Sequence, residues 1–324
     1  MKPFFFGSIL LAFSAVVAAA PAPAPAPAYP QKPIRIIAPF PPGGPGDIVA
    51  REISLRLTEL WGQQAVVDNR AGAGGMIAHE LLAKSAPDGY TLLMGSSGGM
   101  VIQPLMPAKL PYDAMKDFAP VSKVILATHA LVLNPQIEAA SVKELIALAK
   151  ARPGKLNFAS AGIGSATQLS GELFKSMAAI DIVHVPYKGG VPALTDIVAG
   201  QVQFMFNSVP PVLPFSKVGK LKIIAVTSAS RMALMPEVAT VAETLPGFQS
   251  GVWYAIFAPA GTPPAIVRKL SAALITILSE PDLARRLTAQ GVEPQGSTPQ
   301  DLARLIDEDR ARWRPVIAIA RLSD

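Results

Sequence analysis

The sequence predicts an α/β protein with largely parallel sheets. Short apolar segments of strand character alternate with segments of helical periodicity along the chain, which is the pattern of repeated strand–helix units. Glycine-rich turns follow several of the strands, and ligands of such sheets bind outside the carboxyl ends of the strands, where these turns lie. The length of 324 residues allows two domains of roughly 100–200 residues each.

The composition excludes several classes of protein. Half of the residues are hydrophobic and 16% are charged, so a largely disordered chain is not expected. The chain has no cysteine, which excludes disulfides, a thiolate metal site and a cysteine nucleophile. No histidines stand at metal-ligand spacing, so neither a metal nor a cofactor is expected. The formal charge of +6 is scattered among acids, which argues against nucleic acid but suits an anionic ligand.

Residues 1–28 have the features of a secretory signal peptide. A basic second residue precedes an apolar stretch from Phe4 to Ala20, and Ala26-Pro27-Ala28 provides a small-x-small cleavage site. Cleavage after residue 28 is favoured over residue 20, because a cut after residue 20 would place Pro21 next to the scissile bond. A membrane anchor is the alternative, but the apolar stretch is shorter than the roughly 20 residues that a spanning helix needs.

The first half of the mature chain is expected to alternate strands and helices. Strands are expected at residues 34–40, 65–68 and 90–95, and at 121–126 and 131–133 on either side of a crossing of the chain. Asp47 is expected to cap a helix that ends at Gly62, because aspartate favours the start and glycine the end of a helix. A second helix is expected around residues 76–84.

Capping boxes mark helices in the second half. Ser141–Glu144 predicts a helix that runs to about residue 151, and Ser165–Gln168 predicts another. Strands are expected at residues 156–160, 182–185, 202–206, 221–226 and 252–259. After residue 264 the chain is expected to be helical to near its end, with Thr298 as the cap of the final helix.

The stretch "NFASAGIGSATQL", residues 157–169, is close to a phosphate-binding G-x-G-x-x-G loop. Thr167 replaces the third glycine, and Asp181 comes too early and precedes the next strand, so a dinucleotide site is not supported. Because the loop ends at a helix start, free N–H groups and the helix dipole favour a bound anion there. A tight turn that binds nothing is the alternative.

The stretch "GSSGG", residues 95–99, fits G-x-S-x-G with Ser97 in the position of a nucleophile. A hydrolase also needs a helix directly after this turn, and an acid and a histidine later in the chain. Pro104 and Pro107 disfavour a long helix, and the three histidines fall on or beside expected helices and strands. An α/β hydrolase using Ser97 remains an alternative function. Lys188 in "PYKGG" is either a charge partner for an acid or a solvated loop residue.

Seven motifs, taken in order, resemble those of one known family. They are "YPQKPIRIIAPFPPGGPGDIVAR", "VVDNRAGAGG", "APDGYTLLMG", "LPYDAMKDFAPVS", "KLNFASAGIGSATQLSGELFKSMAAIDIVHVPYKGG", "ALTDIVAGQVQFMF" and "FAPAGTP". The chain resembles the substrate-binding receptors of tripartite tricarboxylate transporters, which are also called Bug-type receptors. The resemblance covers essentially all of residues 29–324.

The resemblance implies a two-lobed periplasmic binding protein of the type II, Venus-flytrap class, with a mixed, mostly parallel sheet in each lobe. Lobe 1 would comprise residues 29–127 plus 252–324, and lobe 2 residues 128–251. The protein would be a monomeric receptor, not an enzyme, that binds a small mono-, di- or tricarboxylate between its lobes. It would deliver this ligand to a two-component membrane permease. A carboxylate sensor or scavenger of the same fold, without a role in transport, remains an alternative.

The resemblance also implies which residues bind the ligand, chiefly through main-chain amides and hydroxyl groups. They are Phe40, Pro42, Gly43, Gly44 and Asp47 in the first loop, Ser160, Ala161, Gly162, Gly164, Ser165 and Thr167 in the second, and Ser96, Ser97, Tyr187, Lys188 and Asn207. Three positions depart from the family pattern. Pro45-Gly46 lacks a common hydroxyl residue, Gln168 replaces a common histidine, and Asn207 replaces a common acid. The missing acid favours a plain mono- or dicarboxylate over a ligand with an amino group.

Overall fold

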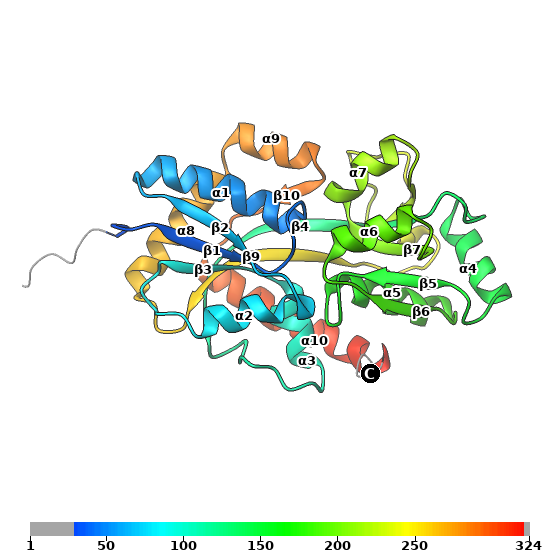
Figure 1. Ribbon diagram of the computed structural model, residues 1–324, viewed down its shortest axis with the longest axis horizontal. Helices are drawn as coiled ribbons and strands as arrows, with labels where there is room; N and C mark the ends of the chain where they lie inside the picture. Colours follow the sequence, from blue (N-terminus) through cyan, green and yellow to red (C-terminus); the bar gives the residue numbers. More distant parts are fainter. Residues whose placement is uncertain (1–28, 321–324) are drawn as a thin grey trace, which may run out of the picture.

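A single sheet of ten strands runs through both lobes of the molecule (Figure 1). The computed structural model describes residues 29–320; the predicted signal peptide, residues 1–28, lies outside the described residues, as do residues 321–324. The strands are β1 (Ile34–Ala38), β2 (Ala65–Asn69), β3 (Thr91–Ser96), β4 (Phe118–Leu133), β5 (Asn157–Ser160), β6 (Val183–Pro186), β7 (Phe204–Ser208), β8 (Lys222–Val226), β9 (Gly251–Pro259) and β10 (Val292–Pro294).

The sheet is mixed, as the sequence predicts. Its strand order is β2-β1-β3-β9-β4-β7-β5-β6, and β8 and β10 also pair with β4. Parallel pairs lie toward its two ends, where β1 joins β2 and β3, and β5 joins β6 and β7. The pairs that involve β4 or β9 are antiparallel. The chain therefore crosses between the lobes through antiparallel strands, while each lobe keeps a parallel part.

The expectation of two separate strands at residues 121–126 and 131–133 is wrong, because β4 is continuous over 16 residues. It pairs with β9 from Phe118 to Thr128 and with β7 from His129 onward. Thr128 and His129 interrupt the apolar pattern but not the strand. Both side chains are buried, and His129 Nδ1 lies 2.9 Å from Ser170 Oγ. The main-chain N–H of His129 donates to Thr227 Oγ1 at 3.0 Å.

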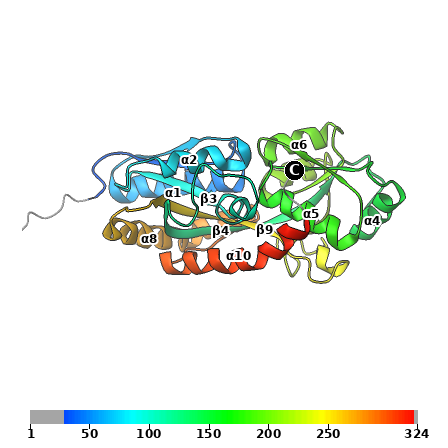
Figure 2. The ribbon, with the colours of Figure 1, turned by 90° about the horizontal axis from the view of Figure 1, so that it is seen from below.

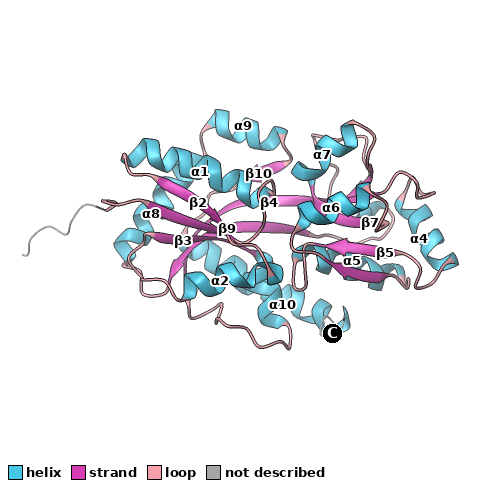
Figure 3. Ribbon diagram, viewed as in Figure 1, coloured by secondary structure: helices cyan, strands magenta, loops and turns pink. Residues whose placement is uncertain are grey.

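Helices cover the sheet in both lobes (Figure 3). The first lobe carries α1 (Pro45–Trp61), α2 (Met76–Ala83), α3 (Gln103–Leu105), α8 (Pro264–Leu278), α9 (Pro281–Ala289), α10 (Pro299–Ala320) and the short helices η1 (Ala73–Gly75) and η2 (Gly98–Ile102). The second carries α4 (Val142–Ala151), α5 (Ala166–Ala178), α6 (Gly190–Val198), α7 (Val209–Lys217) and η3 (Val241–Glu243). Figure 2 shows α10 extending from the first lobe beneath the crossing strands, where it also contacts α5.

Three helix starts follow the capping chemistry that the sequence predicts, whereas the start of α1 does not. Ser141, Ser165 and Thr298 accept hydrogen bonds from main-chain N–H groups three residues on, at 3.1–3.2 Å, which confirms them as caps. Asp47 does not cap α1; the cap is Gly44, and Pro45 occupies the first turn. Proline at this position needs no N–H partner and has the backbone angle of a helix. The helix therefore begins earlier than an aspartate cap would place it.

Each lobe has its own apolar core. In the first, Ile36 and Phe257 of the sheet pack with Ile53 of α1 and Leu82 of α2. In the second, an aromatic cluster fills the core and consists of Phe158, Phe174, Phe204, Phe206 and Phe248. Edge-on and offset aromatic pairs of this kind stabilise a core by about 0.5–1.5 kcal/mol beyond the area they bury. The second lobe also holds a further apolar cluster around Leu194 and Met205.

Candidate functional site

A pocket lies between the two lobes, at the carboxyl ends of strands from both. It is lined by Phe40, Pro41, Gly44, Pro45, Ser96, His129, Ala161, Ser165, Ala166, Thr167, Gly190, Val191, Asn207, Ser208, Pro211, Val252 and Tyr254. Ser96 is the last residue of β3 and Ser208 the last of β7, and Ala161 directly follows β5. The pocket is therefore where the general rule for α/β sheets places a ligand.

Four helices begin at this pocket. Gly44 and Pro45 open α1, Ser165 and Ala166 open α5, Gly190 opens α6, and Ser208 precedes α7. The first N–H groups of a helix have no partner within the helix, and the helix dipole places about half a positive charge there. At the start of α7 the dipole is the main contribution, because Pro210 and Pro211 have no N–H group. Four such ends around one pocket create a positive potential without any basic side chain.

The lining residues carry no formal charge. Neither lysine, arginine, aspartate nor glutamate is among the lining residues within the described chain. Hydroxyl groups of Ser96, Ser165 and Thr167 provide further hydrogen bonds, while Phe40 and Tyr254 give the pocket apolar walls. An anion held here would bind to oriented dipoles, and its carbon skeleton would contact apolar surface. This combination fits a small organic acid.

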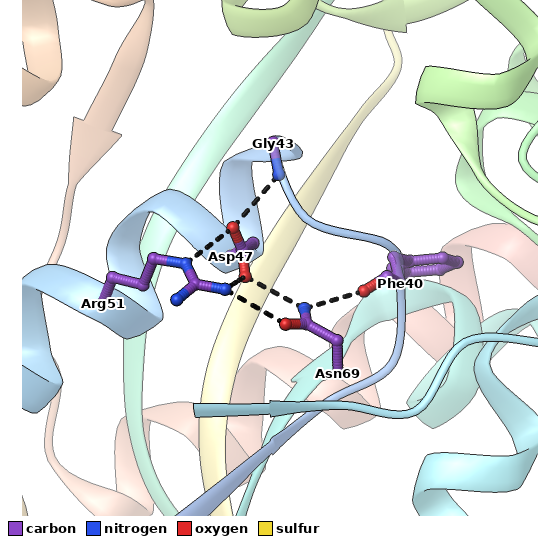
Figure 4. A network of polar contacts seen from close by, with 5 residues as sticks. All are labelled: Phe40, Gly43, Asp47, Arg51 and Asn69. Carbon is purple, nitrogen blue, oxygen red and sulfur yellow. Dashed lines mark hydrogen bonds and ion pairs between the residues drawn. The ribbon is translucent and has the colours of Figure 1, made fainter. Parts of the chain in front are cut away.

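The loop before α1 is held in place by a buried carboxylate (Figure 4). Asp47 accepts hydrogen bonds from Gly43 N at 3.0 Å, from Arg51 at 3.0 Å and from Asn69 Nδ2 at 2.9 Å. Asn69 also donates to the carbonyl of Phe40 at 3.0 Å. Burial raises the pKa of Asp47, but the hydrogen bonds from Arg51, Asn69 and Gly43 outweigh it and hold the pKa below its ordinary value. Asp47 thus orders the loop as a charged residue.

The glycine at position 46 permits close packing against the pocket wall. A Cβ atom there would lie 2.7 Å from the ring of Tyr254, which no real contact allows. The departure from the family pattern at Pro45-Gly46 therefore has a structural consequence, because Tyr254 occupies the space that a larger residue would need. The aromatic ring of Tyr254 lies where a hydroxyl side chain at position 46 would be.

The loop before α5 is ordered by its own side chains. Ala161 N donates to Thr167 Oγ1 at 2.8 Å, and Gly164 N donates to Gln168 Oε1 at 2.7 Å. Gly162 and Gly164 both have positive φ angles, of 125° and 73°, which favour glycine. The side chain of Gln168 is thereby bound to its own loop, so this departure from the family pattern supports the loop and does not line the pocket.

Asn207 lines the pocket, but its amide bonds the main chain. Its Nδ2 donates to the carbonyl of Gly190 at 3.1 Å, and its Oδ1 accepts from Ser208 N at 2.9 Å. One uncharged side chain therefore forms hydrogen bonds with the starts of both α6 and α7 on this side of the pocket.

The predicted site residues are distributed over several places. Seven of them line the pocket, namely Phe40, Gly44, Ser96, Ala161, Ser165, Thr167 and Asn207. Gly162, Tyr187 and Lys188 instead line an apolar groove beside Gln103 and Met106. Ser97 lines a separate cavity near Lys123 and Asp309, under α10. Pro42, Gly43, Asp47, Ser160 and Gly164 lie in or directly beside the loops around the pocket but are not among its lining residues.

Sequence reasoning missed the pocket residues that come from the crossing strands and from the starts of α6 and α7. They are His129, Gly190, Val191, Ser208, Pro211, Val252 and Tyr254. The glycine pair "KGG" before α6 and the prolines after Ser208 mark two of the helix starts, and could have indicated them. Nothing in the pattern of β4 or β9 shows which side chains face the pocket.

A two-lobed α/β molecule with a dipole-lined pocket between the lobes belongs to the class of periplasmic-type solute-binding proteins. The chain belongs to the tripartite tricarboxylate transporter receptor family, TctC, whose sequence profile matches residues 49–322. The protein BugT of Bordetella pertussis is 40% identical over 292 residues, which are 89% of each chain.

Two similar structures hold carboxylates. A Rhodopseudomonas palustris protein with adipate superposes with a TM-score of 0.88 at 35% identity, covering 90% of this chain and 98% of that chain. MatC of the same species, with bound malate, superposes with a TM-score of 0.84 at 35% identity, covering 89% of this chain and 100% of that chain.

Receptors of the TctC family are solute-binding proteins and not enzymes. No histidine bonds Ser97 among the described residues, because Ser97 Oγ has no hydrogen-bond partner there. The hydrolase alternative is therefore set aside.

The helices of the described part of the chain include none with the length and apolar character of a membrane span. Residues 29–320 also contain no cluster of acids and histidines able to hold a metal ion.

Proposed function

We propose that this protein is a periplasmic receptor that binds a small carboxylate between its lobes and delivers it to a tripartite tricarboxylate transporter permease. The observation that carries the proposal is the convergence of four helix starts on a pocket lined by uncharged side chains. Oriented N–H groups in a site sheltered from water bind a carboxylate through charge-assisted hydrogen bonds. The related proteins that hold adipate and malate support the same ligand class.

The ligand is a plain mono- or dicarboxylate. An amino group would need an anionic partner, and Asn207, which lies where the family often has an acid, is uncharged and engaged with the main chain. The apolar walls formed by Phe40, Val191 and Tyr254 suit a short hydrocarbon chain. Strong binding of amino acids, without any binding of simple carboxylates, would contradict this part of the proposal.

The lobes close around the ligand. We place lobe 1 at residues 29–127 plus 252–324 and lobe 2 at residues 128–251, a division supported by the change of partner along β4 at Thr128–His129. Because the ligand contacts helix starts of both lobes, it has higher affinity for the closed state and shifts the population toward it. The remaining predicted site residues, including Ser97, Tyr187 and Lys188, stay predictions for ligand contact in this cycle.

The proposal also includes export of the protein and its partnership with a membrane permease. Residues 1–28 direct the chain to the periplasm, where it acts as a monomer and meets a two-component permease. A thermal-shift screen of residues 29–324 against mono-, di- and tricarboxylates tests the binding function. A ligand present at 100 times its dissociation constant should stabilise the folded state by about 2.7 kcal/mol, and the matching amides should give no shift. The absence of any shift across the panel would overturn the proposal.

A further inference from the structure

One histidine of the crossing strands faces the ligand pocket. His129 lies on β4 opposite Ser208 of β7, and its side chain is fully buried. It lines the pocket together with Ala166, at the start of α5, and Val252 of β9. It therefore lies where the two lobes and the crossing strands meet.

The two ring nitrogens of His129 have different surroundings. Nδ1 lies 2.9 Å from the hydroxyl of Ser170 on α5. Nε2 is buried and has no hydrogen-bond partner among the described residues. A buried polar atom without a partner is costly and calls for an explanation, and at a pocket wall a ligand can supply the missing partner.

Ser170 is able to serve either tautomer of this ring. Its Oγ lies 2.9 Å from the carbonyl of Ala166 and 2.9 Å from the hydroxyl of Ser250. If Ser170 donates to Ala166, Nδ1 must carry the proton of His129, and Nε2 is an acceptor. If Ser250 donates to Ser170 and Ser170 donates to Nδ1, the proton is on Nε2, which is then a donor. A hydroxyl has one donor and two acceptor positions, so both arrangements are satisfied.

We propose that His129 is a ligand-binding residue whose Nε2–H donates to a carboxylate oxygen, and that Ser170 is the positioning residue that stabilises this tautomer. The proposal rests on the proposed function of the pocket. A carboxylate only accepts hydrogen bonds, so its binding selects the tautomer with the proton on Nε2. The resulting chain from Ser250 through Ser170 and His129 to the ligand links α5, both crossing segments and the bound anion.

The donor is a neutral imidazole. Burial lowers the pKa of His129 to about 3, and the side chains that line the pocket within the described residues carry no formal charge. The proton therefore moves from one nitrogen to the other without a change in the charge of the protein. This distinguishes the mechanism from recognition by a histidinium ion, in which binding would take up a proton from solution.

The tautomer is measured by NMR on residues 29–324 with ¹⁵N-labelled histidine rings, titrated with adipate or with the carboxylate that gives the largest thermal shift. The chain has three histidines, and the other two are internal controls. His79 Nδ1 bonds the carbonyl of Gly75 at 2.9 Å, and His184 Nε2 bonds Ser160 at 2.6 Å, away from the pocket lining. At saturation we expect protonated Nε2 and unprotonated Nδ1 in His129, with both controls unchanged.

Two substitutions of His129 separate the donor from the bulk of the ring. His129→Leu should raise the dissociation constant for the same ligand roughly 10- to 100-fold, as expected for a lost hydrogen bond to a charged group. His129→Gln, which keeps an N–H donor, should recover most of that loss. Melting of the ligand-free variants shows whether each still folds. Ser170→Ala removes the donor to Nδ1, so it should weaken binding of the same ligand and change the ¹⁵N shift of Nδ1 in the bound state.

The outcomes distinguish this inference from the proposed function. If no carboxylate binds the unmodified protein, the proposed function fails and this inference fails with it. If a carboxylate binds but Nε2 of His129 stays unprotonated at saturation, or His129→Leu binds within about twofold of the unmodified protein, only the inference is overturned. Proton uptake on binding would also overturn it, in favour of a histidinium.

Discussion

Asp47 shows how a single charged residue can order the loop beside an anion site. It fixes Gly43, Arg51 and Asn69 around the start of α1 and leaves the N–H groups of that helix facing the pocket. A carboxylate in the pocket itself would repel an anionic ligand. The carboxylate of Asp47 instead pairs with Arg51, behind the loop that precedes α1. Its negative charge near the helix start also stabilises the helix dipole.

The charge of Asp47 makes part of the stability pH-dependent. Its folded-state pKa is below the ordinary value, so its contribution is present above that value and is lost as the pH falls through the folded-state pKa. We expect Asp47→Asn to lower the free energy of unfolding by about 1–3 kcal/mol near pH 7. The difference from the unmodified protein should shrink as the pH falls below the ordinary pKa of an aspartate.

Urea unfolding at a series of pH values measures this difference. Comparison with the unmodified protein at each pH removes the effects of other carboxylates with lowered pKa, such as Asp68 and Asp88. A gap between the two proteins that stays constant from neutral to acidic pH would show that the charge of Asp47 is not the stabilising feature.

At the scale of elements, helix starts were the most predictable feature and strand continuity the least. Ser141 and Ser165 could be identified as caps because the capping signal lies within four residues of sequence. The start of α1 was misplaced because Pro45 and Asp47 both favour a helix start, and the tertiary contacts of Asp47 with Asn69 decide between them. The continuity of β4 depends on partners far away in sequence, such as Thr227, and no local pattern encodes that.

The start of α5 allows capping and ligand binding to be separated. Aspartate caps a helix as well as serine does, so Ser165→Asp should keep the start of α5. The ligand-free protein should still melt cooperatively, at a somewhat lower temperature because the new charge is buried. The added charge lies at the anion site and should abolish carboxylate binding. Calorimetric titration measures the binding and thermal melting the stability.

Ser141→Asp is the matched control for this substitution. It makes the same chemical change at the start of α4, which does not line the pocket. It should leave carboxylate binding unchanged. Undiminished binding by Ser165→Asp would contradict the assignment of the α5 start as part of the anion site.

At the scale of the whole molecule, glycines let the two lobes approach closely. A Cβ at Gly98, which follows β3, would lie 3.2 Å from the carbonyl of Gly164 in the loop before α5. Similarly, a Cβ at Gly189 would lie 2.6 Å from Pro41. Side chains at these positions would hold the two loops farther apart than they lie in this structure.

Gly98→Val tests closure, because Gly98 is not among the glycines with positive φ and the new side chain meets the opposite lobe. We expect unchanged melting without ligand but weaker binding, and no contraction in small-angle scattering when ligand is added. Gly99→Ala is the contrast, because its Cβ would meet His79 within the same lobe and should reduce stability. A Gly98→Val protein that contracts like the unmodified one would contradict this account of closure.

The two-lobed architecture could be predicted from ordered motifs, but the composition of the pocket only in part. Residues in loops, such as Ser165 and Thr167, follow from the rule that ligands bind beyond the carboxyl ends of strands. His129 and Tyr254 lie within the crossing strands, where the twist of the sheet and the lobe angle decide which side chains face the ligand. These are properties of the assembled molecule.

The central claim is that helix dipoles in a pocket lined by uncharged side chains bind a carboxylate. Calorimetric titration of residues 29–324 with adipate and with adipamide, which has nearly the same shape without the charge, tests it most directly. The account predicts saturable one-to-one binding of the acid, or of the carboxylate preferred in the thermal screen, and no binding of its amide. Equal binding of the acid and the amide would contradict it.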